Sequence, residues 1–263
     1  MLRQLALLQR TSVIVFQALY SWLDPTAYII IKFVVPFFQM SFFVFLAKFT
    51  LGPDKLAYVA IGNAVQFVAF NTLMGVAITM SGEKWFGTLP VLLTTPASRL
   101  LMFTSRATVH VLDGMMGAVI GLLYAGLFFG VSFAQANLLT LVVVLFFASL
   151  TLTGLGLIIA SLSLFIRDVN QIMNVAYLVV FLLCGINFPV EQLPVWLRPV
   201  AYVIPLTYGI EAARQSIAGA PLAAVGNQLL VMFILFLVEG VLGYYLFLQF
   251  ERLAKRHGTL EVF

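Results

Sequence analysis

Six long apolar segments divide most of the chain, and each is close to the ~20 residues that a helix needs to cross a bilayer. Their approximate bounds are 27–49, 56–80, 106–130, 138–162, 169–188 and 226–249. No internal repeat or low-complexity linker separates them, so residues 1–263 are expected to form one membrane domain. The pattern predicts an all-α integral membrane protein with six transmembrane helices.

Composition supports this fold class. Hydrophobic residues make up 62% of the 263 residues and charged residues only 9%, whereas roughly a quarter of an average soluble domain is charged. So little charge cannot cover a soluble globule, and the mean hydropathy of +1.08 agrees. A soluble enzyme, a disordered chain and a fibrous protein are therefore excluded. The single cysteine, Cys184, excludes a disulfide framework.

Residues 1–23 carry a different pattern, in which polar side chains recur near a helical period. Arg3 and Arg10 lie on one polar arc, with apolar residues mostly elsewhere. This predicts an amphipathic helix lying in the membrane interface. A cleaved signal peptide is the alternative, but Arg10 and Gln17 interrupt the apolar run that it needs. Asp24 and Pro25 are expected to end or kink the helix.

The stretch 189–220 is apolar but broken by four prolines, which are Pro189, Pro194, Pro199 and Pro205. A lipid-exposed helix cannot contain so many, because each proline frees backbone groups that hydrocarbon cannot satisfy. We therefore expect two short broken helices that enter the membrane edge and return, a re-entrant hairpin between spans five and six.

The distribution of Lys and Arg predicts the orientation. With a cytoplasmic N-terminus, nine basic residues fall on the inside and four on the outside, while Lys32 lies within a span. Both termini are therefore expected in the cytoplasm, with an even number of spans. Counting 196–217 as a seventh span would place the basic residues of the C-terminal tail outside, against the rule.

Several kinds of chemistry lack their residues. None of the four lysines follows a glycine, so there is no Walker A motif for ATP. His110 and His257 are far apart, and no zinc or Ser-His-Asp enzyme signature is present. The basic residues are scattered, so nucleic-acid binding is not expected. The chain is expected to have no catalytic residue, metal site or cofactor of its own.

Three stretches carry a resemblance to a known family. Residues 83–99 contain a Glu before a Gly-Thr-Leu element and then a Pro-Ala-Ser-Arg element. Residues 165–169 read Phe-Ile-Arg-Asp-Val, and 185–214 contain Gly-Ile-Asn-Phe-Pro followed by Ile-Pro-Leu-Thr-Tyr-Gly. With the order of the apolar segments, the chain resembles the membrane permease subunit of type-2 ABC exporters, which have the type V exporter fold.

The resemblance implies a half-transporter at the cell inner (plasma) membrane. Two copies of the chain, or one copy with a close relative, would form the pore in membrane lipid. Two separate ATP-binding subunits would hold the ATP and magnesium. Residues 1–23 would be the interface helix, 82–99 the cytoplasmic coupling loop and 189–220 the extracytoplasmic exit hairpin.

The residues expected to act follow from these segments. Coupling to the ATPase is assigned to Glu83, Lys84, Trp85, Phe86, Gly87, Thr88 and Arg99. The exit hairpin is assigned to Phe188, Pro189, Leu193, Pro194, Trp196 and Pro205. Gly82 and Gly87 are expected to let the chain turn sharply in this loop. The alternative is that the loop is an ordinary interfacial anchor.

Three charged residues, Lys32, Asp113 and Glu239, fall inside apolar spans, where a charge is costly. A proton relay is one interpretation. The alternatives are snorkelling, which is favoured for Lys32, a local pair of Asp113 with His110, and inter-helix pairing. Glu239 lies near the middle of the last span, where neither snorkelling nor a local pair readily explains a charge.

Small and polar residues within the spans have two interpretations each. The pairs Gly117/Gly121 and Gly126/Gly130 favour close helix packing, within one subunit rather than at a dimer seam. Four polar residues of the second span could line a conduit or bond between helices; they are Asn63, Gln66, Asn71 and Thr72.

The function expected from all this is export of an amphipathic or lipid-linked molecule, such as a glycolipid or polysaccharide precursor, a hydrophobic drug or a lipopeptide. The alternatives are an ion-coupled secondary transporter that uses Lys32, Asp113 and Glu239, and a non-transporting membrane scaffold.

Overall fold

The computed structural model describes residues 25–85, 87, 99–162 and 169–257, and every regular element in these ranges is helical. The long helices are α3 (Val35–Thr50), α4 (Leu56–Trp85), α6 (Arg99–Leu127), α7 (Leu138–Leu162), α8 (Val169–Leu183), α10 (Pro205–Ile217) and α11 (Gly226–His257). The short ones are α2 (Pro25–Ile29), the π-helix η1 (Ile30–Val34), η2 (Pro53–Lys55), η3 (Val190–Gln192), α9 (Arg198–Val203) and η4 (Leu222–Val225).

Five helical stretches of the described chain are long and apolar enough to cross a membrane. They correspond to the first four predicted spans and to the last. The fifth predicted span corresponds to α8, a shorter apolar helix of 15 residues that ends at Leu183, before the predicted end at 188. The all-helical class is confirmed for the described residues, and the count of six spans stays a prediction. The predicted interface helix 1–23 lies outside the described residues.

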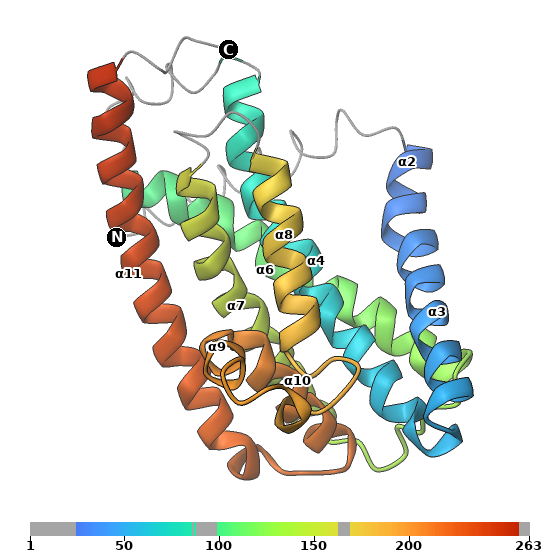
Figure 1. Ribbon diagram of the computed structural model, residues 1–263. Coiled ribbons are helices and arrows are strands. Elements are labelled where there is room, and N and C mark those ends of the chain that lie inside the picture. Colours follow the sequence, from blue (N-terminus) through green and yellow to red (C-terminus); the bar gives the residue numbers. More distant parts are fainter. Residues whose placement is uncertain (1–24, 86, 88–98, 163–168, 258–263) are drawn as a thin grey trace.

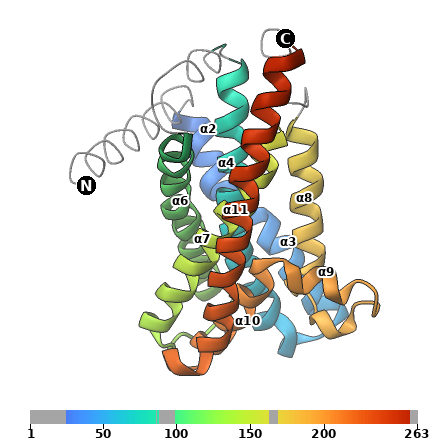
Figure 2. The ribbon, with the colours of Figure 1, turned by 90° about the vertical axis from the view of Figure 1, so that its left-hand side faces the viewer.

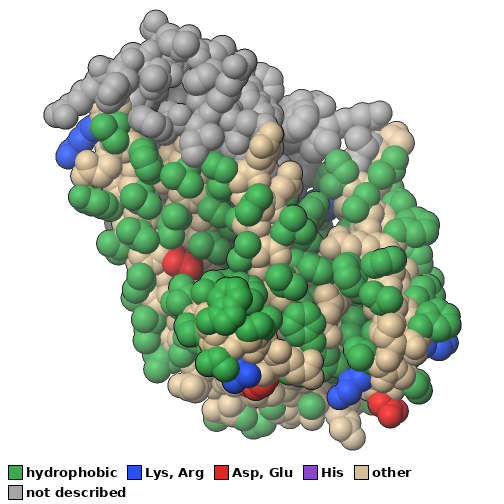
Figure 3. Space-filling model, viewed as in Figure 1, with side chains coloured by type: hydrophobic (Ala, Val, Ile, Leu, Met, Phe, Trp, Pro, Cys, Tyr) green, Lys and Arg blue, Asp and Glu red, His purple; other side chains and the backbone are tan. Residues whose placement is uncertain are grey.

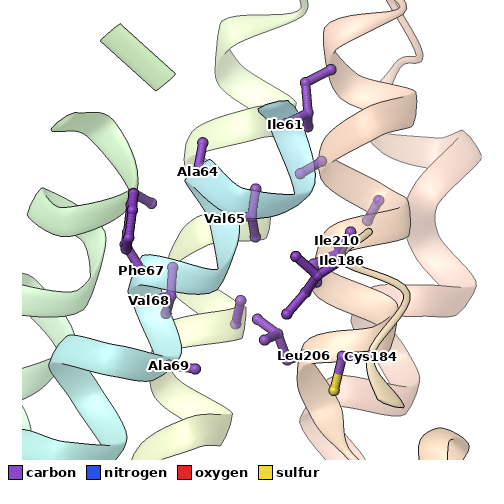
Figure 4. Packing of buried hydrophobic residues seen from close by; sticks show 14 of the residues in the cluster. Ile61, Ala64, Val65, Phe67, Val68, Ala69, Cys184, Ile186, Leu206 and Ile210 are labelled. Carbon is purple, nitrogen blue, oxygen red and sulfur yellow. The ribbon is translucent and has the colours of Figure 1, made fainter. Parts of the chain in front are cut away.

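Helix α4 runs through the middle of the bundle and packs on α3, α6, α7, α8 and α10 (Figures 1 and 2). Val65 and Val68 on α4 are fully buried and lie opposite Ile186, Leu206 and Ile210 from the segment that follows α8 (Figure 4). The core therefore joins the central helix directly to the predicted exit hairpin.

The outer surface is apolar, as a bilayer requires. Figure 3 shows hydrophobic side chains over most of one face, with charged side chains mainly near the lower end. Helices α3 and α11 contribute much of this surface. In the spans that contain them, only 33% and 17% of the most apolar stretch is buried. Lipid can solvate such side chains, so their exposure is consistent with a membrane location.

The predicted hairpin consists of short helical pieces. Pro199 and Pro205 lie in the first turns of α9 and α10, where a missing backbone N–H costs no helical hydrogen bond. Both helices lie at the lower end of the bundle (Figure 1). Helix α10 packs on α4, α7 and α11, and Leu206 and Ile210 on it are fully buried.

The expected loop 82–99 begins later than predicted. Helix α4 continues through Gly82 to Trp85, because one glycine costs a helix only about 1 kcal/mol and no proline intervenes. Gly87 follows with a φ of 65°, a left-handed conformation that glycine adopts without strain just after a helix. The opposite border of the loop agrees with the prediction, since α6 begins at Arg99.

The pairing of Gly126 with Gly130 as a helix-packing motif is wrong. Helix α6 ends at Leu127, and Gly130 has a φ of 68° in the turn beyond it. Gly126 faces the ring of Phe133 in that same turn. The spacing of small residues did not reveal that the helix stops between the two glycines.

Gly117 and Gly121 do form a close seam within the subunit. A Cβ atom at Gly121 would lie 2.7 Å from the Cα of Ala64 on α4, and one at Gly117 would collide with the Asn71 side chain. The two helices therefore approach each other where only glycine fits.

We predict that Gly121→Ala destabilises the protein by about 1–3 kcal/mol, because the new methyl group must push back the α4 backbone. The matched control is Gly240→Ala in α11, where nothing lies within 4 Å of the added atom and the helix gains propensity. Thermal unfolding in detergent measures both. Equal melting temperatures for the two variants would contradict the close α4–α6 seam.

Candidate functional site

A buried ion pair joins the first span to the centre of the bundle. Lys32 Nζ lies 2.6 Å from both carboxylate oxygens of Asp113 on α6, and it also donates to Asn71 Oδ1 on α4. The side chains of Lys32 and Asp113 are 9% and 10% exposed. The two charges neutralise each other in a region where neither could be solvated.

The snorkelling predicted for Lys32 is therefore wrong. Its neighbours Ile31 and Phe33 are 42% and 41% exposed, whereas Lys32 is only 8% exposed. This part of the first span turns its apolar side chains outward and its one charge inward. Lys32 lies in the π-helix η1, a local widening that changes the direction of side chains and is frequent at functional sites.

Further buried polar contacts follow this ion pair along the seam between α4 and α6, toward the end of α4. Thr72 Oγ1 lies 3.0 Å from Ser149 Oγ on α7 and donates to the His110 carbonyl, while Ser149 Oγ donates to the carbonyl of Val111. His110 Nε2 lies 2.8 Å from Thr79 Oγ1. His110 thus bonds across to α4, and Asp113 pairs with Lys32 on the first span rather than locally with His110.

The other two polar residues predicted on the second span also bond between elements. The Tyr177 hydroxyl on α8 donates to Gln66 Oε1 at 2.7 Å, and it accepts from Gln39 Nε2 on α3 at 3.0 Å. Asn63 Nδ2 donates to Asn187 Oδ1 beyond α8 at 2.8 Å. All four polar residues are buried, so they connect helices rather than line an open conduit.

Arg214, near the end of α10, clamps three segments together, a role that the sequence reasoning missed. Its Nη2 atom donates to the carbonyls of Tyr58, Gly185 and Ile186 at 2.9–3.0 Å. Its guanidinium carbon lies 3.4 Å from the centre of the Tyr58 ring, a cation–π contact. Burial lowers the pKa of Arg214 to about 10, so the group stays charged at neutral pH.

Gly62 on α4 makes room for this clamp. A Cβ atom there would collide with the Ile186 carbonyl oxygen and lie 2.7 Å from Arg214 Nη2. In the sequence, Arg214 is one of four charged residues in the stretch 189–220, so its charge alone did not single it out.

The predicted hairpin residues divide into buried and exposed sets. Leu193 is 5% exposed, and Pro205 is buried at the start of α10. Phe188 and Pro189 are half-buried, whereas Pro194 and Trp196 face outward. Trp196 is 74% exposed, which suits an indole anchored at the membrane interface.

The predicted coupling residues lie at the opposite end of the helices from the hairpin. Glu83, Lys84 and Trp85 are the last three residues of α4, Gly87 is exposed beyond it, and Arg99 is the first residue of α6. Phe86 and Thr88 lie outside the described residues, as do Arg3 and Arg10 of the predicted interface helix.

Glu239, the third intramembrane charge, lies apart from the Lys32–Asp113 pair. It is 6% exposed and projects from α11 onto Gly154 of α7. Its Oε2 atom has no hydrogen-bond partner among the described residues.

These features define a multi-pass helical membrane protein with polar contacts buried between its helices. Residues 9–218 match the family described as the ABC-2 type transporter. The match covers more than half of the chain, so the chain belongs to this family, and the resemblance seen in its motifs is confirmed. It is an ABC-2 permease by family.

Two curated relatives from Escherichia coli K12 are similar to the chain. One is described as the probable multidrug ABC transporter permease YbhS, 26% identical over 175 residues, which cover 64% of this chain and 44% of the relative. The other is the probable multidrug ABC transporter permease YbhR, 27% identical over 187 residues, which cover 69% of this chain and 50% of the relative. The chain thus spans about half the length of the curated relatives it matches.

We predict that Lys32→Met and Asp113→Leu each lower the free energy of unfolding by about 3–5 kcal/mol, because each leaves an unpaired charge in the interior. The double variant should lose clearly less than the sum, since it leaves no charge behind. Thermal and denaturant unfolding in detergent give the coupling energy. Additive losses would show that the pair does not hold the first span to α4 and α6.

Proposed function

We propose that the chain is the transmembrane half of an ATP-driven exporter, and that a separate subunit hydrolyses the ATP. The observation that carries the proposal is the match of residues 9–218 to the ABC-2 type transporter family. This sequence has no Walker A lysine, which supports a partner chain as the proposed site that binds ATP and magnesium. The chain itself would be a transport subunit and not an enzyme.

The proposed substrate is an amphipathic or lipid-linked molecule: a hydrophobic drug, a lipopeptide or a glycolipid precursor. The two curated relatives are described as probable multidrug permeases, which favours the drug class. The described spans also offer few fixed charges, and two of them neutralise each other in the Lys32–Asp113 pair. Such an interior suits an apolar molecule better than a hydrated ion or a free sugar.

The proposed coupling element is the connection between α4 and α6, where Glu83 and Arg99 stand at the facing helix ends. A partner that binds this connection would act directly on the two helices that meet at the Gly117–Gly121 seam. A shift of the connection would therefore be transmitted along α4, which contacts most of the bundle.

The proposed exit lies at the other end of α4, at the hairpin 189–220. Helix α10 is packed on three long helices and is clamped by Arg214, whereas Val195, Trp196 and Val203 are 74%, 74% and 64% exposed. The hairpin thus has an anchored half and an outward apolar half. A small movement of the outward half would open a path without breaking a full span.

The proposed assembly contains two ATP-binding subunits and a second copy of this chain, or a close relative, in the inner membrane. Both termini would be cytoplasmic, the six predicted helices would cross, and the hairpin would return to the outer side. The 9:4 distribution of basic residues supports this orientation.

An ion-coupled secondary transporter is less well supported. Lys32 and Asp113 neutralise each other beside α4, while Glu239 lies against α7. A proton relay needs a continuous chain of titratable groups, whereas the described contacts join Lys32 to Asp113 and place Glu239 against Gly154 of α7.

We predict that single cysteines at positions 55, 134 and 200 react with a membrane-impermeant maleimide in intact cells, and that a cysteine at 257 reacts only after permeabilisation. The native Cys184 is 1% exposed and gives little background. Labelling of position 257 from outside would contradict the six-span topology, and protection of position 200 would contradict the outward return of the hairpin.

We predict that Glu83→Ala and Arg99→Ala each weaken association with the ATP-binding subunit by about tenfold or more, because removing one partner of a buried charged contact costs about 2–5 kcal/mol. Substrate-stimulated ATP hydrolysis by the reconstituted complex should fall in parallel. Lys55→Ala, an exposed basic residue at the hairpin end of the helices, is the control. Wild-type association and stimulation in both variants would overturn the coupling assignment.

A further inference from the structure

Glu239 of α11 packs against Gly154 of α7, in the seam between the two helices. A Cβ atom at Gly154 would lie 3.0 Å from the Glu239 Cβ and 3.2 Å from Oε2, so the glycine leaves the space that the carboxyl group fills. The residue is 94% buried, since only 6% of it is exposed. The carboxyl group interacts with the backbone of Leu155, and Oε2 is left without a hydrogen-bond partner among the described residues.

Among the described elements, the three that pack most closely on α11 are α7, α10 and η4, and they supply no cation for this carboxyl group. Helix α7 contains no charged residue over its 25 residues, and η4 contains none. Helix α10 carries Arg214, but that guanidinium is bonded to the carbonyls of Tyr58, Gly185 and Ile186. Lys32 is paired with Asp113 beside α4.

The surroundings select the kind of cation that could bind here. A metal ion would need several oxygen ligands, and the described residues contain no cluster of three or more His, Cys, Asp or Glu side chains that could hold one. A small ammonium ion would lose its hydration in an apolar seam. A bulky organic cation with a spread or shielded charge loses little hydration, and its apolar surface gains from the same environment.

The outward side of α11 next to this seam is apolar, as the surface that meets a lipid-dissolved molecule would be. Val238, Val241 and Leu242, which flank Glu239 on α11, are 56%, 71% and 45% exposed. Phe147 of α7 and Phe233 of α11 meet across the seam with ring centres 6.4 Å apart. Phe233 precedes Glu239 by six residues, or roughly 9 Å along the helix. Aromatic faces therefore lie at the distance that an extended hydrophobic cation would span.

We propose that Glu239, in the α7–α11 seam, is a binding site for hydrophobic organic cations that enter from the lipid. The proposal deepens the proposed export function, on which its physiological meaning rests, by naming a substrate class: amphipathic molecules with one delocalised or quaternary positive charge. The binding itself belongs to this chain and needs no ATP.

The test is equilibrium binding of tetraphenylphosphonium to the purified full chain in nanodiscs of zwitterionic lipid, with tetraphenylborate as the anion of the same shape. After the partition of each ion into empty nanodiscs has been subtracted, wild type should bind the phosphonium saturably and more tightly than the borate. Glu239→Gln, which keeps the shape and removes the charge, should weaken phosphonium binding at least tenfold and leave borate binding unchanged or tighter. Glu239→Asp should lose less.

Asp54→Asn is the matched control, because it removes one carboxylate from an exposed turn outside the seam and should leave the affinity unchanged. Size-exclusion and melting profiles show whether each variant is folded. If Glu239→Gln does not fold, the preference of wild type for phosphonium over borate and its reduction in Glu239→Asp still decide the question. Phosphonium binding by Glu239→Gln within twofold of wild type, or no preference over borate in wild type, overturns the proposal.

The Glu239 binding site and the proposed export function can be overturned independently. A complex with the ATP-binding subunit that is stimulated by a neutral amphiphile, while the chain shows no cation preference, would overturn the Glu239 site and leave export standing. Cation binding that depends on Glu239 in a chain that never couples to ATP hydrolysis would support the site and overturn the export function.

Discussion

Polar groups inside a bilayer must find their partners within the protein, and the arrangement of this bundle depends on how α4 meets that requirement. Asn63, Gln66, Asn71 and Thr72 bond to different neighbours, which are the segment after α8, α8 itself, the first span, and α6 with α7. A polar side chain in hydrocarbon loses more by being unpaired than it gains from any one bond. The four residues therefore fix which helix stands at each side of α4, where apolar contacts alone would be interchangeable.

Small residues make these polar contacts possible. Gly114 and Gly117 on α6 leave the space that Thr72 and Asn71 occupy, and Gly75 on α4 leaves the space for the His110 ring. Each of these three side chains thus lies opposite a glycine on the facing helix. The close approach of the helices and the hydrogen bonds between them depend on each other, because only a short distance between helices brings short polar side chains within bonding range.

Hydropathy predicted the positions of the long helices well, because the length of an apolar run is set by the thickness of the bilayer. The proline spacing likewise predicted the short helices α9 and α10. Neither hydropathy nor proline spacing could predict the direction of a side chain. Whether Lys32 snorkels or turns inward depends on Asp113, which is 81 residues away in the sequence. The Arg214 clamp was missed for the same reason, since its partners are backbone carbonyls that carry no sequence signal. The end of α6 before Gly130 was missed because glycine spacing looks the same in a helix and in a turn.

The Arg214 clamp sets a condition on any movement of the segment 189–220, the proposed exit. One guanidinium nitrogen holds three carbonyls from two segments, and the Tyr58 ring covers the same group. Hydrogen bonds to a charged group contribute about 1.5–3 kcal/mol each, so releasing all three at once in an apolar region would be costly. The motion with the lowest free-energy cost would keep α10, the end of α8 and the start of α4 together. The outward part of the segment 189–220 would then move against them. That division coincides with the exposed Trp196 on one side and the buried Ile210 on the other.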